Sequence, residues 1–171
     1  MRNIPSVDLN DFMCNDFDRK KSFVKKIGKA YNEIGFVALK GHFLNNEDIK
    51  EVYRSIKEFF DLPNDIKSKY ELEGFDGQRG YTSFGKEHAK GKKQGDLKEF
   101  WHFGQYLDDN EYSIFNYPKN QLVEELPKFN DIGKKVFQSL EKTAIYVLRA
   151  ISLYLDLEEY HFDKYVKKGN S

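Results

Sequence analysis

The sequence predicts a mixed fold of the α/β type, in the α+β class, in which several helices are combined with a few short strands. Apolar residues recur at three- and four-residue spacing over several long stretches, which is the period of a helix that buries one face. Between these stretches lie short apolar or alternating runs, which are typical of strands. The chain has 171 residues, including 15 Phe and 11 Tyr, so it is long and aromatic enough to form a hydrophobic core.

The first part of the chain is expected to alternate between strands and helices. Asp8 and Asn10 mark the end of the first strand, and Gly35 stands where a helix is expected to stop. Pro63 suits the first turn of a short helix. The expected elements are a strand over residues 4–9, a helix over about 16–34, a strand over 36–39, a helix from 45 or 46 to 62, and a short helix from 63 to 70.

The second part of the chain begins with a glycine-rich stretch over residues 71–95. We expect a long loop there, with at most one strand near residues 81–84. After a strand that follows this loop, apolar residues trace one continuous helical face over about residues 129–155. A short helix over residues 158–166 is expected to follow.

The strand after the loop is expected over residues 97–106, where aromatic residues roughly alternate with polar ones. Trp101 and Phe103 share one face of this strand, and His102 points to the other. We therefore expect the two aromatic residues to pack in the core and His102 to be a structural histidine.

Charge and cysteine content exclude several classes of protein. Lys plus Arg and Asp plus Glu balance at 28 each, so no global field favours nucleic acid or an anionic membrane surface as a partner. A single cysteine, Cys14, excludes an internal disulfide framework and fits a reducing compartment. No apolar run approaches the length needed to span a bilayer. The sequence thus predicts a soluble protein that is cytoplasmic by default, and a nucleic-acid binder is the weakest hypothesis.

Five blocks carry a resemblance to a known family, in order along the chain: IPSVDL, IGFVALKGH, EFFDLPNDIK, GQRGYTSFGKE and DLKEFWHFG. Together they resemble the N-terminal region of the isopenicillin N synthase-like dioxygenases, which depend on iron(II) and 2-oxoglutarate. The resemblance implies an N-terminal helical region followed by the first strands of a double-stranded β-helix (jelly roll), which would be incomplete here. It also implies an oxidoreductase that oxidises a small-molecule substrate with iron(II), dioxygen and 2-oxoglutarate.

The chain departs from this family where the cofactors would be held. The family's iron ligands lie in its C-terminal half, as a His-x-Asp pair and a later His, and an Arg-x-Ser pair binds the co-substrate. These segments are absent from residues 1–171. We therefore expect a single domain that is truncated before the iron-binding core and inactive alone. Either the gene or the protein has been shortened, or a partner chain supplies the missing C-terminal half. The alternative function is a non-catalytic binding or assembly module derived from the family.

One His-x-Asp triplet does occur, at His161-Phe162-Asp163. Two histidines and one carboxylate form the facial site typical of this iron chemistry, yet no histidine follows Asp163 to complete it. The triplet also looks helical, and residues two apart on a helix point to different sides. We therefore expect a helix surface here and no metal site within the chain.

Arg79 and Tyr81 are the candidate substrate-binding residues. The resemblance places their Arg-Gly-Tyr block at the mouth of the active site, where it can bind a substrate carboxylate, and arginine suits this task through its two-pronged donor geometry. The alternative is an exposed arginine on a flexible loop, with Tyr81 packing into the barrel. The nearby basic residues form either a lid over an anionic substrate or a plain solvated loop, and they are Lys86, His88, Lys90, Lys92 and Lys93.

Overall fold

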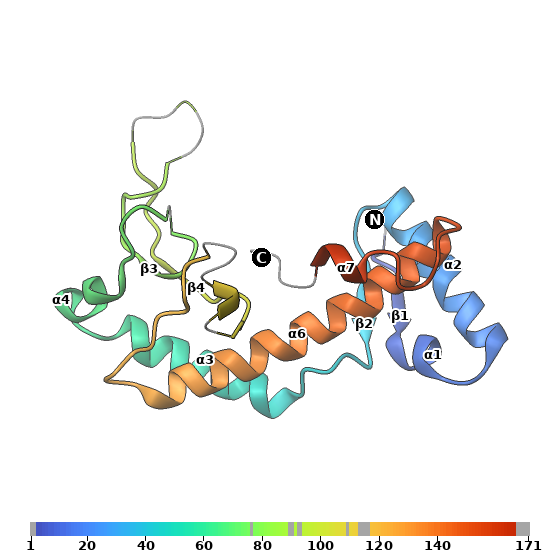
Figure 1. Cartoon of the computed structure of the whole chain (residues 1–171), viewed down its shortest axis with the longest axis horizontal. Coiled ribbons are helices and arrows are strands. Elements are labelled where there is room, and N and C mark those ends of the chain that lie inside the picture. Colours follow the sequence, from blue (N-terminus) through green and yellow to red (C-terminus); the bar gives the residue numbers. More distant parts are fainter. Residues whose placement is uncertain are drawn as a thin grey trace. The chain divides into compact units, whose positions relative to one another are not determined.

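The computed structural model describes residues 3–75, 77–88, 91, 94–108, 110–112 and 117–166 (Figure 1). These residues divide into two compact units, each with its own hydrophobic cluster. The first unit contains residues 3–45 and 138–166, and the second contains the described residues of 46–137. The division falls within the long helix α6 (Pro127–Tyr154).

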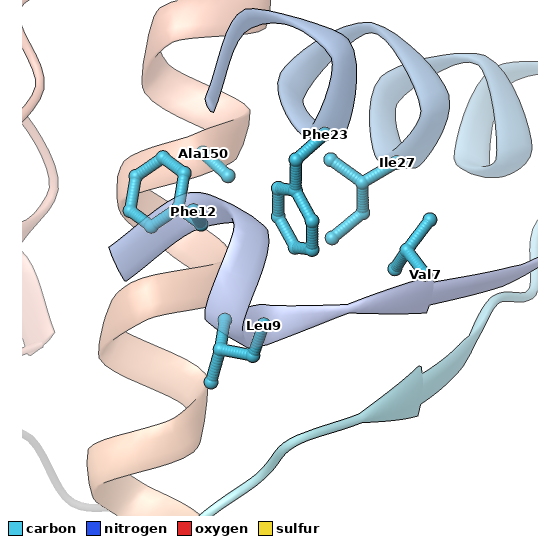
Figure 2. Packing of buried hydrophobic residues seen from close by; sticks show 6 residues of the cluster. All are labelled: Val7, Leu9, Phe12, Phe23, Ile27 and Ala150. Atoms are coloured by element: carbon cyan, nitrogen blue, oxygen red, sulfur yellow. The ribbon is translucent and has the colours of Figure 1, made fainter. Parts of the chain in front are cut away.

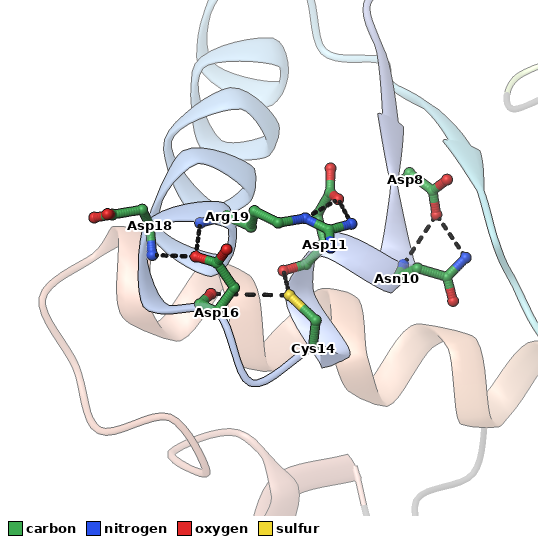
Figure 3. A network of polar contacts seen from close by, with 7 residues as sticks. All are labelled: Asp8, Asn10, Asp11, Cys14, Asp16, Asp18 and Arg19. Atoms are coloured by element: carbon green, nitrogen blue, oxygen red, sulfur yellow. Dashed lines mark hydrogen bonds and ion pairs between the residues drawn. The ribbon is translucent and has the colours of Figure 1, made fainter.

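The first unit opens with strand β1 (Ser6–Asp8), which pairs in parallel with β2 (Ala38–Lys40). Helix α1 (Leu9–Met13) follows β1 directly, because the Asp8 carboxylate accepts the backbone N–H of Asn10 at 3.0 Å and caps the helix (Figure 3). The predicted strand is therefore confirmed, but it is shorter than residues 4–9. The polar residues that suggested a strand exit in fact begin a helix that the sequence did not predict.

Helix α2 (Phe17–Glu33) begins and ends where the sequence predicts. The Asp16 carboxylate accepts the backbone N–H groups of Asp18 and Arg19, each at 3.0 Å (Figure 3). At the other end Gly35 has a φ of +83°, and its N–H donates to the carbonyls of Ala30 and Tyr31. Glycine adopts this left-handed conformation at low cost, so it ends the helix.

The core of the first unit consists of apolar side chains from β1, α1, α2 and the second half of α6 (Figure 2). The rings of Phe12 and Phe23 lie 5.5 Å apart. Gly28 of α2 lies against Tyr154, since a Cβ at Gly28 would be 2.1 Å from that ring. The six buried residues of this cluster are Val7, Leu9, Phe12, Phe23, Ile27 and Ala150.

Two ion pairs hold the C-terminal segment in the first unit. Arg149 of α6 binds Asp163, with Nη2 2.6 Å from Oδ2, and Lys20 of α2 binds Glu159 at 2.8 Å. Asp163 begins the short helix α7 (Asp163–Val166). The helix predicted over residues 158–166 is thus present only in its last four residues.

The second unit starts with helix α3 (Asn46–Phe60), then α4 (Asn64–Lys67) and the 3₁₀ helix η1 (Ser68–Tyr70). The carbonyl of Pro63 accepts the N–H groups of Ile66 and Lys67, so the chain turns into α4 directly after the proline. Both the second predicted helix and the short helix after it are confirmed.

Strands β3 (Gly80–Thr82) and β4 (Phe100–His102) pair in antiparallel fashion, with Tyr81 opposite Trp101. The strand predicted over residues 97–106 is therefore much shorter. Because β3 offers only three residues to pair with, the ladder ends after His102. The mixed α+β class is confirmed by the described elements, which include two two-stranded sheets.

An aromatic cluster forms the core of the second unit. Phe59 stacks on Phe129 with ring centroids 5.1 Å apart, and Trp101 meets Phe59 edge-on at 4.8 Å. Phe129 lies in the first turn of α6, which begins at Pro127 instead of the predicted residue 129. None of the helices in the described part of the chain has the length and apolar character needed to cross a membrane.

Candidate functional site

Arg79 lies directly before β3 and is buried, with only 4% of its surface exposed. Its Nη1 donates to the Gln78 carbonyl at 2.6 Å. Burial lowers the pKa of the guanidinium, because desolvation disfavours the charged form, and the nearby Tyr112 partly opposes this shift. The alternative of an exposed arginine is therefore wrong. The role of Arg79 in binding a substrate stays a prediction.

The guanidinium of Arg79 lies directly against the backbone of Gly104. A Cβ at Gly104 would lie 1.7 Å from Cζ of Arg79, so any other residue would collide with the guanidinium. Gly104 is itself held by the side chain of Asn120, which accepts its N–H at 2.7 Å and donates to its carbonyl at 2.9 Å. The next residue is fixed as well, since the Tyr112 hydroxyl donates to the Gln105 carbonyl at 3.0 Å.

Tyr81 belongs to the aromatic core and to a buried polar network. Its hydroxyl donates to Oε2 of Glu99 at 2.5 Å, and the Lys67 ammonium donates to the same oxygen at 2.8 Å. The pKa of Tyr81 lies well above its usual value. Burial is the largest cause, and the hydrogen bond to the Glu99 carboxylate is the second. Burial alone would raise the pKa of Glu99 too, but the hydrogen bonds from Lys67 and Tyr81 outweigh it and lower that pKa.

The strand residues next to this network lie as the alternation predicts. Trp101 and Phe103 pack against the aromatic cluster of the second unit. His102 is exposed, and its Nδ1 lies 2.5 Å from the Gly77 carbonyl, within hydrogen-bond distance. The predicted packing of the two aromatic residues is therefore confirmed, and the structural role of His102 stays a prediction.

A cavity of about 680 Å³ lies beside β3 in the second unit. The Lys86 ammonium at its edge binds Glu71 at 2.6 Å, and Glu71 also accepts the Ser83 N–H at 2.9 Å. Lys98 binds Glu87 in the same region at 2.6 Å. Of the predicted lid residues, Lys86 is thus paired with a carboxylate. Three further lysines of the predicted lid, Lys90, Lys92 and Lys93, lie outside the described residues. The residues that line the cavity are Glu71, Leu72, Glu73, Gly74, Gly77, Tyr81, Thr82, Lys86, Glu87 and His88.

The triplet at residues 161–163 is arranged differently from a metal site. The Asp163 carboxylate binds Arg149 through both Nε and Nη2, and the His161 ring lies edge-on to Phe162. Among the residues that the structure describes, no three His, Cys, Asp or Glu side chains come together as metal ligands would. The described residues therefore do not fit an iron site.

Sequence reasoning missed the partners that position Arg79 and Tyr81. A glycine within the aromatic strand run was a usable signal for Gly104, because glycine inside a strand pattern often marks a close approach of another group. No comparable signal marks Lys67, Glu99 or Asn120. Polar residues are common on helices and loops, and their partners lie 32 and 16 residues away in sequence.

A family model described as "non-haem dioxygenase in morphine synthesis N-terminal" matches residues 4–125. A 1-aminocyclopropane-1-carboxylate oxidase from Dictyostelium discoideum is 31% identical over 170 residues, and the match covers 95% of this chain and 45% of that protein. The chain therefore spans about half the length of this relative.

Solved structures also match nearly the whole chain over about half of their own length. A 2OG-Fe(II) oxygenase family protein from Caulobacter crescentus superposes with a TM-score of 0.82 and 34% sequence identity, covering 99% of this chain and 54% of that protein. A full-length protein of Neurospora crassa, solved in complex with α-ketoglutarate, superposes with a TM-score of 0.74 at 23% identity. That match covers 94% of this chain and 46% of the Neurospora protein, and it shows a shared fold.

Proposed function

The chain belongs to the family of non-haem dioxygenase N-terminal regions, and we propose that it is the N-terminal part of an iron(II)- and 2-oxoglutarate-dependent oxygenase. The whole protein would be a cytoplasmic enzyme that oxidises a small molecule. One observation carries the proposal: nearly the whole chain superposes on about half of a 2OG-Fe(II) oxygenase family protein. In this proposal residues 1–171 act as a single domain, and β3 and β4 are the first strands of the jelly roll.

Arg79 is the residue that we propose binds an anionic group of the substrate. A charged guanidinium buried among protein groups is costly, and proteins hold such charges mainly where they have a specific partner or task. Tyr81 would contribute from the adjoining strand β3, where it lines the cavity and anchors the strand through Glu99. The chain would thus supply the scaffold and part of the substrate pocket.

Iron would be held outside the described residues, because these residues do not bring together three side chains that could act as metal ligands. The 2-oxoglutarate would be held there as well. When bound, iron and 2-oxoglutarate supply the oxidising chemistry of this family. What this chain contributes is the placement of the Arg79 guanidinium and the packing that fixes β3 and β4.

The first test of this division is an iron titration of the 171-residue chain. We expect no stoichiometric binding of iron(II), with or without 2-oxoglutarate, in anaerobic calorimetry, because Asp163 is engaged by Arg149. A matched His161→Ala, Asp163→Ala double variant should give the same flat titration. Micromolar binding that disappears in the double variant would show that this chain builds its own site.

The second test is the reading frame beyond Ser171 and the activity of its complete product. A continuation through a His-x-Asp pair, a later His and Arg-x-Ser, together with decarboxylation of 2-oxoglutarate, would support the oxygenase. A stop codon at this point would favour the alternative, a binding or assembly module derived from the family.

A further inference from the structure

Two asparagines of the second unit hold backbone segments in the same way. The Asn120 side chain binds both the N–H and the carbonyl of Gly104, at 2.7 and 2.9 Å. The Asn130 side chain binds both the N–H and the carbonyl of Val123, at 2.8 and 2.9 Å. Each amide thus replaces one rung of a β-ladder and fixes the position of a single residue.

The two clamped residues differ in what rests on them. Val123 is fully buried in the aromatic cluster, where it serves packing. Gly104 contacts the Arg79 guanidinium, which occupies the space that a Cβ at Gly104 would need. A shift of the Gly104 backbone would move the contact surface on which the guanidinium lies.

Asn120 acts where the strand pairing stops. The β3–β4 ladder ends at His102, so β3 no longer fixes the backbone at Gly104. Asn120 also donates to the Gln105 carbonyl at 3.4 Å, which extends its hold by one residue. The segment that supports Arg79 therefore depends on this side chain for its position.

We propose that Asn120 is a positioning residue for anion binding, which acts by clamping Gly104 under the Arg79 guanidinium. The proposal rests on the proposed role of Arg79 in binding an anionic substrate group. It assigns no contact with the substrate to Asn120 itself. It predicts that loss of the Asn120 side chain speeds solvent exchange at the Arg79 guanidinium more than loss of the Asn130 side chain does.

The experiment compares Asn120→Ala with Asn130→Ala in the 171-residue chain labelled with ¹⁵N-arginine. The Arg79 Nε–H signal is identified by its absence in Arg79→Lys. We expect its solvent exchange to be about tenfold faster in Asn120→Ala, because exchange reports local opening, and within about twofold of the parent in Asn130→Ala. Equal acceleration in both variants, or none in Asn120→Ala, would overturn the proposal.

Acetate serves as the anion probe in a second measurement on the same samples. We expect acetate to shift the Arg79 Nε–H signal in the parent and in Asn130→Ala, and to bind about tenfold more weakly to Asn120→Ala. If acetate leaves the parent signal unchanged, the anion role of Arg79 fails, while the exchange rates still decide whether Asn120 positions it. Should Asn120→Ala not fold, Asn120→Ser removes the two-pronged amide with a smaller loss of polarity, and parent-like exchange in that variant would equally refute the proposal.

Discussion

The two units differ in what they bury. In the first unit the buried cluster is apolar throughout, and ion pairs such as Lys20 with Glu159 are partly exposed. The second unit contains an aromatic cluster and also buries charged side chains, including Lys67 and Arg79. Buried charge costs free energy unless it is paired and hydrogen-bonded, whereas apolar burial stabilises a fold without such conditions.

This difference separates scaffold from site. Apolar packing and helix caps account for the stability of the first unit, so we assign no functional role to the residues of its apolar cluster. The second unit places a guanidinium against Gly104 and an ammonium against Glu99 and the Phe60 carbonyl. Each of these buried charged groups needs specific polar partners. For this reason we assign the candidate substrate contacts to the second unit.

The largest effect is expected from removing the partner of the buried lysine. Glu99→Ala leaves the Lys67 ammonium, whose side chain is 5% exposed, without its carboxylate. We expect the free energy of unfolding to fall by about 3–5 kcal/mol, the usual cost of breaking a buried pair. Urea unfolding followed by fluorescence of Trp101, which belongs to this cluster, measures the change.

A double variant, Lys67→Met with Glu99→Gln, is the matched control. It removes both charges, so most of the loss should be recovered, since apolar replacement of a buried pair is often close to neutral. A loss of less than about 1 kcal/mol in Glu99→Ala would instead mean that the pair behaves like a surface salt bridge. The contrast between the two units would then disappear.

A smaller effect is expected from acid, and it should also act on the second unit. Hydrogen bonds hold the pKa of Glu71 and of Glu99 below the ordinary value of 4.5, against the opposing effect of burial. Since these folded-state pKa values are lowered, their stabilisation is present above about pH 4.5 and is lost as the pH falls through the lowered values. The urea midpoint reported by Trp101 should therefore fall with acid, and less steeply in Glu99→Gln. An identical slope in that variant would show that Glu99 does not carry this dependence.

Much of the fold could be predicted from the sequence, because its signals are local. The helix stop at Gly35 and the turn at Pro63 act through neighbouring backbone groups, and both were placed correctly. The strand lengths were not predicted correctly, because the length of a strand depends on its partner strand. The aromatic run over residues 97–106 looks like one long strand, yet β3 pairs with only three of its residues.

The candidate site was predictable only in part. Arg79 and Tyr81 were singled out through a family resemblance, but their burial and partners are products of tertiary structure. Glu99 meets Tyr81 from 18 residues away in sequence, and Asn120 reaches Gly104 across 16. Neither separation leaves a periodic signal in a single sequence.

The smallest stability effect is expected in the first unit. Lys20→Met removes the ion pair with Glu159, whose two side chains are 30% and 25% exposed. Solvent screens this pair, so we expect a loss of about 1 kcal/mol or less in urea unfolding followed by circular dichroism. A loss as large as that of Glu99→Ala would show that the first unit also depends on a specific charge pair.

The most direct test of the account is the Arg79→Ala substitution in the complete oxygenase. We expect kcat/KM for an anionic substrate to fall by about 10- to 100-fold, because one charge-assisted contact is lost. Turnover of 2-oxoglutarate without substrate should stay within about twofold, since the proposal places the co-substrate site outside this chain. Arg79→Lys, which keeps the charge but not the two-pronged geometry, should lie between the two. Equal loss of both activities in Arg79→Ala would contradict the account and make Arg79 a structural residue.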